Sequence, residues 1–239
     1  SSLVIEAGTG TGKTLAYLAP VLLFNKKTII STGSKNLQDQ LFNRDLPAIK
    51  KALNFTGKIA LLKGRANYLC LERLDQVIAQ GVLGDKSVLT DLSKVRKWNN
   101  STKTGDFTEC VELAEDSPII SQLTSTAESC LGTDCPNYSE CYVAAARRKA
   151  LNADLVVINH HLFFADMAVK ETGFGELIPH AEVIIFDEAH QLPDIASQYF
   201  GQSLTSRQLF DLCKDINIVY RTELKDMLQL GSTSDTLLK

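Results

Sequence analysis

Residues 7–14, AGTGTGKT, carry the groups that the phosphates of a nucleotide require. Glycines let the backbone approach an anion closely, a lysine reaches the outer phosphates, and a hydroxyl holds Mg²⁺. Lys13 supplies the ammonium and Thr14 the hydroxyl, while Ala7 stands where the strict pattern has Gly. The alternative is an ordinary turn rich in Gly and Thr. We expect nucleotide binding by this loop, on Ala7, Gly8, Thr9, Gly10, Thr11, Gly12, Lys13 and Thr14.

A second motif, IIFDEAH at residues 184–190, has two adjacent carboxylates after an apolar run. A strand that ends here places Asp187 at the sheet edge that also carries the phosphate loop, where it can hold Mg²⁺ directly or through water. Glu188 can then orient and deprotonate the attacking water. Such a pair is also common as a solvated strand end, so the hydrolytic interpretation depends on the phosphate loop. Together the motifs predict ATP hydrolysis.

The elements that position these motifs follow the alternation of a parallel sheet with helices on both faces. Helical patterns begin at Lys13 and span residues 35–53. The expected strands are LVIE (3–6), TIIST (28–32), KIALLK (58–63) and the apolar runs that open ADLVVINHHLFFADM (153–167) and AEVIIFDEAHQL (181–192). This predicts an α/β fold with a parallel sheet.

Residues 65–150 interrupt that alternation, are polar, and hold five of the six cysteines. A structureless loop of this length is improbable, so we expect an inserted, mostly helical domain. Within it Cys130, Cys135 and Cys141 form C-x4-C-x5-C, and Cys70 lies sixty residues before Cys130. Neither zinc-knuckle nor ferredoxin spacing fits, so the spacing leaves zinc and iron–sulfur open.

Composition excludes some classes of protein. The formal charge of −3 over 239 residues is incompatible with a uniformly basic nucleic-acid coat, although local basic patches remain possible. No long apolar run or leader is visible, so we expect a cytoplasmic setting without a membrane. There, cysteines serve more often as metal ligands, reactive thiols or core residues than in disulfides.

The segments EAGTGTGKT, STGSKNLQDQL, LLKGRANYLC, VVINHHLF and DEAH follow one another as in the DinG/YoaA-type bacterial relatives of the XPD helicases, which are superfamily 2 enzymes. Residues 3 to about 200 resemble this family. The resemblance implies a RecA-like motor domain in 1–64 and 151–204, an iron–sulfur domain in 65–150, and the start of a helical arch domain in 205–239. It also implies a [4Fe–4S] cluster on Cys70, Cys130, Cys135 and Cys141, whereas Cys110 and Cys213 match no ligand position.

The resemblance further implies contacts with the translocated DNA strand by the segment after TIIST, through Thr32, Lys35, Asn36 and Gln38. A simple helix cap at Ser34 is the alternative. His190 would link the nucleotide and DNA sites, with an ordinary buried histidine as its alternative.

Other side chains have two interpretations each. Trp98, among Lys94, Arg96 and Lys97, could stack on bases, but packing of a small core is favoured. The basic cluster at 147–149 could bind DNA or form a solvated helix end. The adjacent His160 and His161 are expected to hydrogen-bond backbone or DNA rather than zinc.

We therefore expect a 5′–3′ ATP-dependent DNA helicase motor that uses ATP, Mg²⁺ and the cluster. Its expected partners are single-stranded DNA, forked or damaged duplexes, and replication or repair proteins at the nucleoid. The chain is expected to be a fragment without the second motor domain, and hence inactive alone. The alternatives are a metal-stabilised P-loop nucleic-acid-binding or sensor module, and a non-helicase NTPase with a structural zinc insert.

Overall fold

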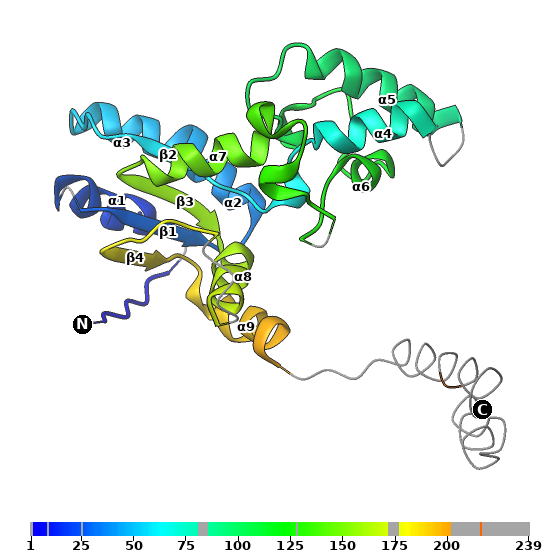
Figure 1. Cartoon of the computed structure of the whole chain (residues 1–239). Coiled ribbons are helices and arrows are strands. Elements are labelled where there is room, and N and C mark those ends of the chain that lie inside the picture. The colour runs from blue at the N-terminus through cyan, green and yellow to red at the C-terminus, as the bar shows by residue number, and fades with distance from the viewer. Residues whose placement is uncertain are drawn as a thin grey trace. The chain divides into compact units, whose positions relative to one another are not determined.

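The computed structural model describes residues 2–8, 10–24, 26–80, 86–127, 129–171, 177–201 and 216 (Figure 1). Ser1–Ile195 form one compact unit and Ala196–Lys239 a second. Apart from residue 216, the expected start of the arch domain at 205–239 lies outside the described residues, as do Thr9 and Cys213.

A four-stranded parallel sheet forms the centre of the first unit. Its strands stand in the order β2 (Ile59–Leu61), β3 (Leu155–Asn159), β1 (Thr28–Thr32) and β4 (Val183–Phe186). Every residue of β1 and β3 is buried, as expected for parallel strands covered on both faces. The predicted α/β class and parallel sheet are confirmed.

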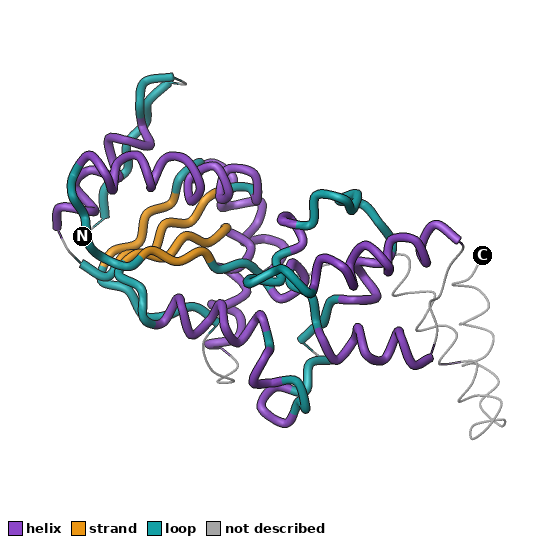
Figure 2. The backbone as a smooth tube through the Cα atoms, turned by 90° about the horizontal axis from the view of Figure 1, so that it is seen from above, coloured by secondary structure: helices purple, strands orange, loops and turns teal. Residues whose placement is uncertain are grey.

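Helices cover both faces of this sheet (Figure 2). They are α1 (Lys13–Phe24), α2 (Lys35–Gln40), a π-helical turn (Leu41–Asp45), α3 (Leu46–Ala52), α7 (Tyr142–Leu151) and α8 (His160–Glu171). A further helix, α9 (Leu192–Phe200), follows β4 in the sequence. Successive strand residues point to opposite faces. Ile30 therefore packs with Leu18 and Leu46 of α1 and α3, whereas Ile29 packs with Ala150 of α7 and Leu162 of α8.

The inserted segment has a core of its own. Its helices α4 (Leu71–Gln80), α5 (Lys86–Asn99) and α6 (Ile119–Leu123) lie together, away from the strands (Figure 1). Their buried apolar residues form one cluster, which includes Leu74, Val95 and Ile119. α7 joins the two cores, since Tyr142 packs against the inserted cluster and Ala150 against the sheet.

The strand expected at residues 3–6 is not formed. Residues 2–8 have no regular secondary structure, and Leu3, Val4 and Ile5 are 82%, 93% and 76% exposed. An apolar run becomes a strand only when its backbone N–H and C=O groups find a neighbouring strand. No described strand pairs with this segment. None of the helices in the described residues combines the length and apolar character needed to cross a bilayer.

Candidate nucleotide and nucleic-acid site

The phosphate loop runs directly into the first turn of α1. Gly10 (φ 75°) and Gly12 (φ 82°) adopt left-handed backbone conformations that favour glycine, and a Cβ at either would meet nothing within 4 Å. The Thr11 hydroxyl donates to the Gly8 carbonyl (2.8 Å), and the Lys13 ammonium donates to the Ala7 carbonyl (3.0 Å). The lysine side chain therefore spans the loop.

The structure brings the two sequence motifs together through Tyr17. Its hydroxyl, one turn along α1 from Lys13, donates to Asp187 Oδ2 over 3.1 Å. Burial and the negative charge of Asp187 raise the pKa of Tyr17, so the phenol stays protonated as a donor. This hydrogen bond places the phosphate-loop helix beside the carboxylate that follows β4.

Glu188 follows in an unusual conformation. Its backbone is left-handed (φ 57°, ψ 43°), which non-glycine residues adopt only when their surroundings impose it. Its N–H donates to Asp187 Oδ1 (3.1 Å), and its carbonyl accepts from the Gln191 N–H (3.1 Å). His190 Nδ1 lies 3.4 Å from Glu188 Oε2, and its side chain is 71% exposed. The alternative of an ordinary buried histidine at position 190 is therefore wrong.

His160 lies beneath this turn and is fully buried. Its Nδ1 is 2.7 Å from Ser31 Oγ and its Nε2 is 2.9 Å from the Asp187 carbonyl oxygen. The expected backbone hydrogen bond is confirmed for His160, whereas His161 is exposed.

The segment expected to contact DNA divides into exposed and buried residues. Ser34 caps α2 by accepting from the Leu37 N–H (3.2 Å), and Lys35 and Asn36 are exposed. Thr32 is only 1% exposed and donates to the Ser34 carbonyl. Of the expected DNA-contacting side chains, Lys35 and Asn36 are thus accessible to a partner, whereas Thr32 is not.

Gln38 requires a correction. Its side chain is 0% exposed, and its amide nitrogen donates to the carbonyls of Leu62 (2.9 Å) and Val157 (3.2 Å). Those carbonyls lie beyond the end of β2 and in β3, so the amide ties α2 to the sheet. Because the side chain is buried and its amide already donates to two backbone carbonyls, the expected DNA contact by the Gln38 side chain is wrong.

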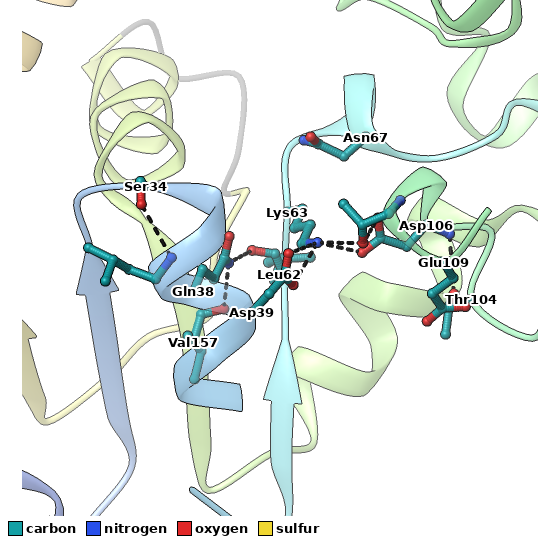
Figure 3. A network of polar contacts seen from close by, with 12 residues as sticks. Ser34, Gln38, Asp39, Leu62, Lys63, Asn67, Thr104, Asp106, Glu109 and Val157 are labelled. Carbon is teal, nitrogen blue, oxygen red and sulfur yellow. Dashed lines mark hydrogen bonds and ion pairs between the residues drawn. The ribbon is translucent and has the colours of Figure 1, made fainter. Parts of the chain in front are cut away.

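Sequence reasoning missed Lys63, which lies just beyond β2. Its buried ammonium contacts Asp39 Oδ1 (2.8 Å), Asp106 Oδ2 (2.8 Å) and Thr108 Oγ1 (3.1 Å) (Figure 3). Asp39 belongs to α2, whereas Asp106 and Thr108 belong to the insertion. Lys63 therefore joins the insertion to the sheet domain. The sequence signal for it is a lysine at the end of the apolar run expected as a strand at 58–63.

Cys70 interacts electrostatically with two of the other expected cluster ligands. Burial raises the pKa of the Cys70 thiol, and the charges of Cys135 and Cys141 act in the same direction, so Cys70 lies within electrostatic reach of both. Cys130 is exposed. In the described residues, no three His, Cys, Asp or Glu side chains are grouped closely enough to hold a single metal ion.

The Arg147 guanidinium lies near two of these thiols and near Arg65. Burial, followed by the charge of Arg65, lowers the pKa of Arg147, while Cys130 and Cys141 oppose that shift. A cation that interacts with two of the four expected thiols suits an anionic metal–thiolate group, so the donor types are compatible with an iron–sulfur cluster.

Two further side chains belong to the core of the insertion. Cys110 is 3% exposed within its apolar cluster, as expected for an ordinary residue. Trp98 stacks on Phe107 with ring centroids 5.5 Å apart and packs against the same cluster. The core interpretation of Trp98 is confirmed.

Comparison with known proteins identifies the family. Residues 44–209 match the DEAD_2 family, and the chain therefore belongs to it. Over 239 residues the chain is 94% identical to the ATP-dependent DNA helicase YoaA of Haemophilus influenzae, and over 235 residues (98% of the chain) it is 64% identical to YoaA of Escherichia coli. It is 35% identical over 97% of its length to the ATP-dependent helicase DinG of Mycobacterium tuberculosis.

The resemblance to DinG/YoaA-type helicases is thus confirmed. The chain spans 37% of each YoaA relative and 38% of the DinG relative.

Proposed function

We propose that this chain is the nucleotide-binding motor part of an ATP-dependent DNA helicase that moves 5′ to 3′ along single-stranded DNA. The hydrogen bond from Tyr17 to Asp187 carries the proposal, because it brings the phosphate loop and the two carboxylates to one edge of the sheet. The names of the relatives, which are ATP-dependent DNA helicases, support both the nucleotide and the DNA.

Each side chain at that edge has a role in hydrolysis. The loop amides and Lys13 would bind the phosphates, and Thr14 and Asp187 would hold Mg²⁺. The ion, when bound, offsets negative charge on the transferred phosphoryl group. Glu188, held in its left-handed conformation beside the Asp187 carboxylate, would orient the attacking water and accept its proton. His190, beside Glu188, would link this site to DNA.

The insertion would carry a [4Fe–4S] cluster on Cys70, Cys130, Cys135 and Cys141. When bound, the cluster would tie together a segment whose own apolar core is small. Arg147 would balance part of the charge of the thiolates. We further propose that Lys35 and Asn36 contact the translocated strand, that forked or damaged duplexes are the substrates, and that replication or repair proteins at the nucleoid are partners.

The test is DNA-stimulated ATP hydrolysis and fork unwinding by a protein of the relatives' full length that carries this segment, here termed the full-length protein. We expect both activities in the parental protein and neither in Glu188→Gln, which keeps the shape of the side chain but cannot accept the proton. Nucleotide-dependent DNA binding without stimulated hydrolysis would favour the sensor alternative instead.

A further inference from the structure

His160 lies across the carboxyl ends of three neighbouring strands. It directly follows β3, its Nδ1 contacts the Ser31 hydroxyl of β1, and its Nε2 contacts the Asp187 carbonyl just after β4. The strand register aligns these groups, since Ser31 pairs with Ile158 on one side and Phe186 on the other. A buried imidazole is therefore placed between the β1 end and the Asp187–Glu188 turn.

The partners of the imidazole define its protonation. A carbonyl oxygen only accepts, so Nε2 must carry the hydrogen that it donates to Asp187. In a neutral ring Nδ1 then lacks a hydrogen and accepts from the Ser31 hydroxyl. His160 is fully buried, and such surroundings disfavour a charged ring. The hydrogen bonds thus run in one direction, from Ser31 through His160 to Asp187.

The same serine also holds Asp187 from the other side. The Asp187 N–H donates to the Ser31 carbonyl oxygen over 2.9 Å, while the Asp187 carbonyl accepts from His160. Both peptide groups of Asp187 are therefore fixed, directly or through the imidazole, to Ser31. The second of these groups joins Asp187 to Glu188, so its orientation determines where the Glu188 backbone begins.

That restraint matters because Glu188 is strained. A left-handed backbone is unfavourable for a non-glycine residue and persists only when neighbouring groups impose it. The hydrogen bond from His160 acts on the peptide that leads into this residue. At the other end of the hydrogen-bond chain, Ser31 is followed directly by Thr32, and the exposed Lys35 and Asn36 come a few residues later. A displacement of that segment would reach Ser31 and hence the imidazole.

We propose that His160 is a positioning residue that sets the direction of Glu188 and, through Ser31, couples DNA contact after β1 to water activation. This inference rests on the proposed function, because it assigns Glu188 and the segment after β1 the roles given above. It adds a residue that touches neither nucleotide nor DNA, but acts through the peptide of Asp187.

The first test uses the full-length protein and separates binding from turnover. His160→Phe fills a similar volume but offers neither hydrogen bond. We expect nucleotide and single-stranded DNA dissociation constants close to the parental values, and DNA-stimulated kcat lowered by about 100-fold, as for a misplaced catalytic group. His160→Gln, whose amide can still donate to the Asp187 carbonyl, should recover much of kcat. His180→Gln, at an exposed histidine before β4, should match the parent.

Ser31→Ala tests the coupling step. Without the hydroxyl, the imidazole loses its link to β1 but can still donate to Asp187. We expect the ratio of DNA-stimulated to basal hydrolysis to fall towards one, whereas an unchanged ratio would contradict the coupling. A parental kcat in His160→Phe would overturn the positioning role, while a parental protein without DNA-stimulated hydrolysis would refute the proposed function itself.

A spectroscopic measurement keeps the proposal testable even where His160→Phe does not fold. Nitrogen-15 NMR of histidine-labelled 239-residue chain at neutral pH should show His160 as the Nε2–H tautomer, with an unprotonated Nδ1 that accepts a hydrogen bond. The Nδ1 resonance should shift in Ser31→Ala. An Nδ1–H tautomer, or an Nδ1 resonance unaffected by Ser31→Ala, would contradict the hydrogen-bond direction on which the proposal rests.

Discussion

The Lys63 ammonium lies 2.8 Å from a carboxylate oxygen of Asp106, with no exposed side-chain area on the lysine and 7% on the aspartate (Figure 3). Asp39 supplies a second carboxylate at the same distance and is 25% exposed. A buried charge is tolerated only when it is paired and hydrogen-bonded. This ion pair is therefore a specific connection between α2, the end of β2 and the insertion, and changes on one side of it affect the other.

Removing the cation should destabilise this connection strongly. Lys63→Met fills similar space but leaves Asp106 buried without its partner, and we expect the free energy of unfolding to fall by about 3–5 kcal/mol. Denaturant unfolding of the 239-residue chain measures this, with limited proteolysis to locate the loosened segment. Lys97→Met is the matched control, because Lys97 and Glu112 form an ion pair 3.8 Å long whose side chains are 80% and 64% exposed. That change should cost at most about 1 kcal/mol. Equal effects of the two substitutions would contradict the structural role of Lys63.

Two substitutions in the nucleotide site should separate nucleotide binding from ATP hydrolysis. Lys13→Ala removes the ammonium that now spans the loop to Ala7, so nucleotide affinity and nearly all turnover of the full-length protein should be lost. Glu188→Gln should bind Mg-ATP close to normally while turnover falls by about 100-fold or more. Equilibrium binding of a fluorescent nucleotide and steady-state phosphate release measure the two quantities. If Glu188→Gln hydrolyses ATP at the parental rate, the water-activating role belongs to another residue.

The cysteines should fall into two groups. Replacing Cys70, Cys130, Cys135 or Cys141 with serine opens the coordination shell, so each change should abolish iron content and the brown absorbance of anaerobically purified protein. Cys110→Ala, in the apolar core of the insertion, should keep both. Iron and zinc are measured by elemental analysis. A colourless parental protein with one tightly bound zinc would replace the cluster by a structural zinc site.

The central strands of the sheet could be predicted from local sequence patterns. The apolar runs at 28–32 and 155–159 became buried parallel strands, since such runs suit strands covered on both faces. The apolar residues 3–5 did not become a strand, because a strand needs a partner that no local pattern supplies. The adjacent carboxylates of Asp187 and Glu188 could also be predicted from local sequence, because they form a motif at the end of a predicted strand.

Long-range contacts account for what the sequence did not reveal. Lys63 meets Asp106 across 43 positions, and His160 meets Ser31 across 129, so neither pairing has a local signal. Gln38 shows a subtler failure. The resemblance assigned the whole segment to DNA contact, but a resemblance does not say which side chains of a short helix face inward. The Gln38 amide instead donates to two carbonyls of the sheet domain.

The structural role of Gln38 in α2 can be tested directly against the exposed position of Lys35. Gln38→Ala removes the donor to the Leu62 and Val157 carbonyls and should lower the free energy of unfolding by about 1–3 kcal/mol. Lys35→Ala removes only an exposed charge, so it should leave stability unchanged. In the full-length protein it should weaken single-stranded DNA binding and reduce the slope of log affinity against log salt by about one. Unchanged stability in Gln38→Ala with weakened DNA binding would reinstate the direct contact.

The last prediction concerns acid stability of the insertion. Hydrogen bonds from Lys94 (2.7 Å) and Ser117 (2.6 Å) lower the pKa of Asp91 below its ordinary value of 3.8. Because the folded-state pKa is depressed, this carboxylate stabilises the fold above its ordinary pKa, and the contribution is lost as pH falls through the folded-state value. Asp91→Asn should therefore lower the free energy of unfolding by about 1 kcal/mol at neutral pH, a small value because the lysine is part-exposed and the ion pair is screened by solvent. The loss should become progressively smaller in acid, because Asp91 is then protonated in the parental chain as well. Chemical unfolding of the parental and Asp91→Asn chains across acidic to neutral pH measures the difference. A difference that stays constant as Asp91 protonates would assign the loss to packing rather than to the carboxylate charge.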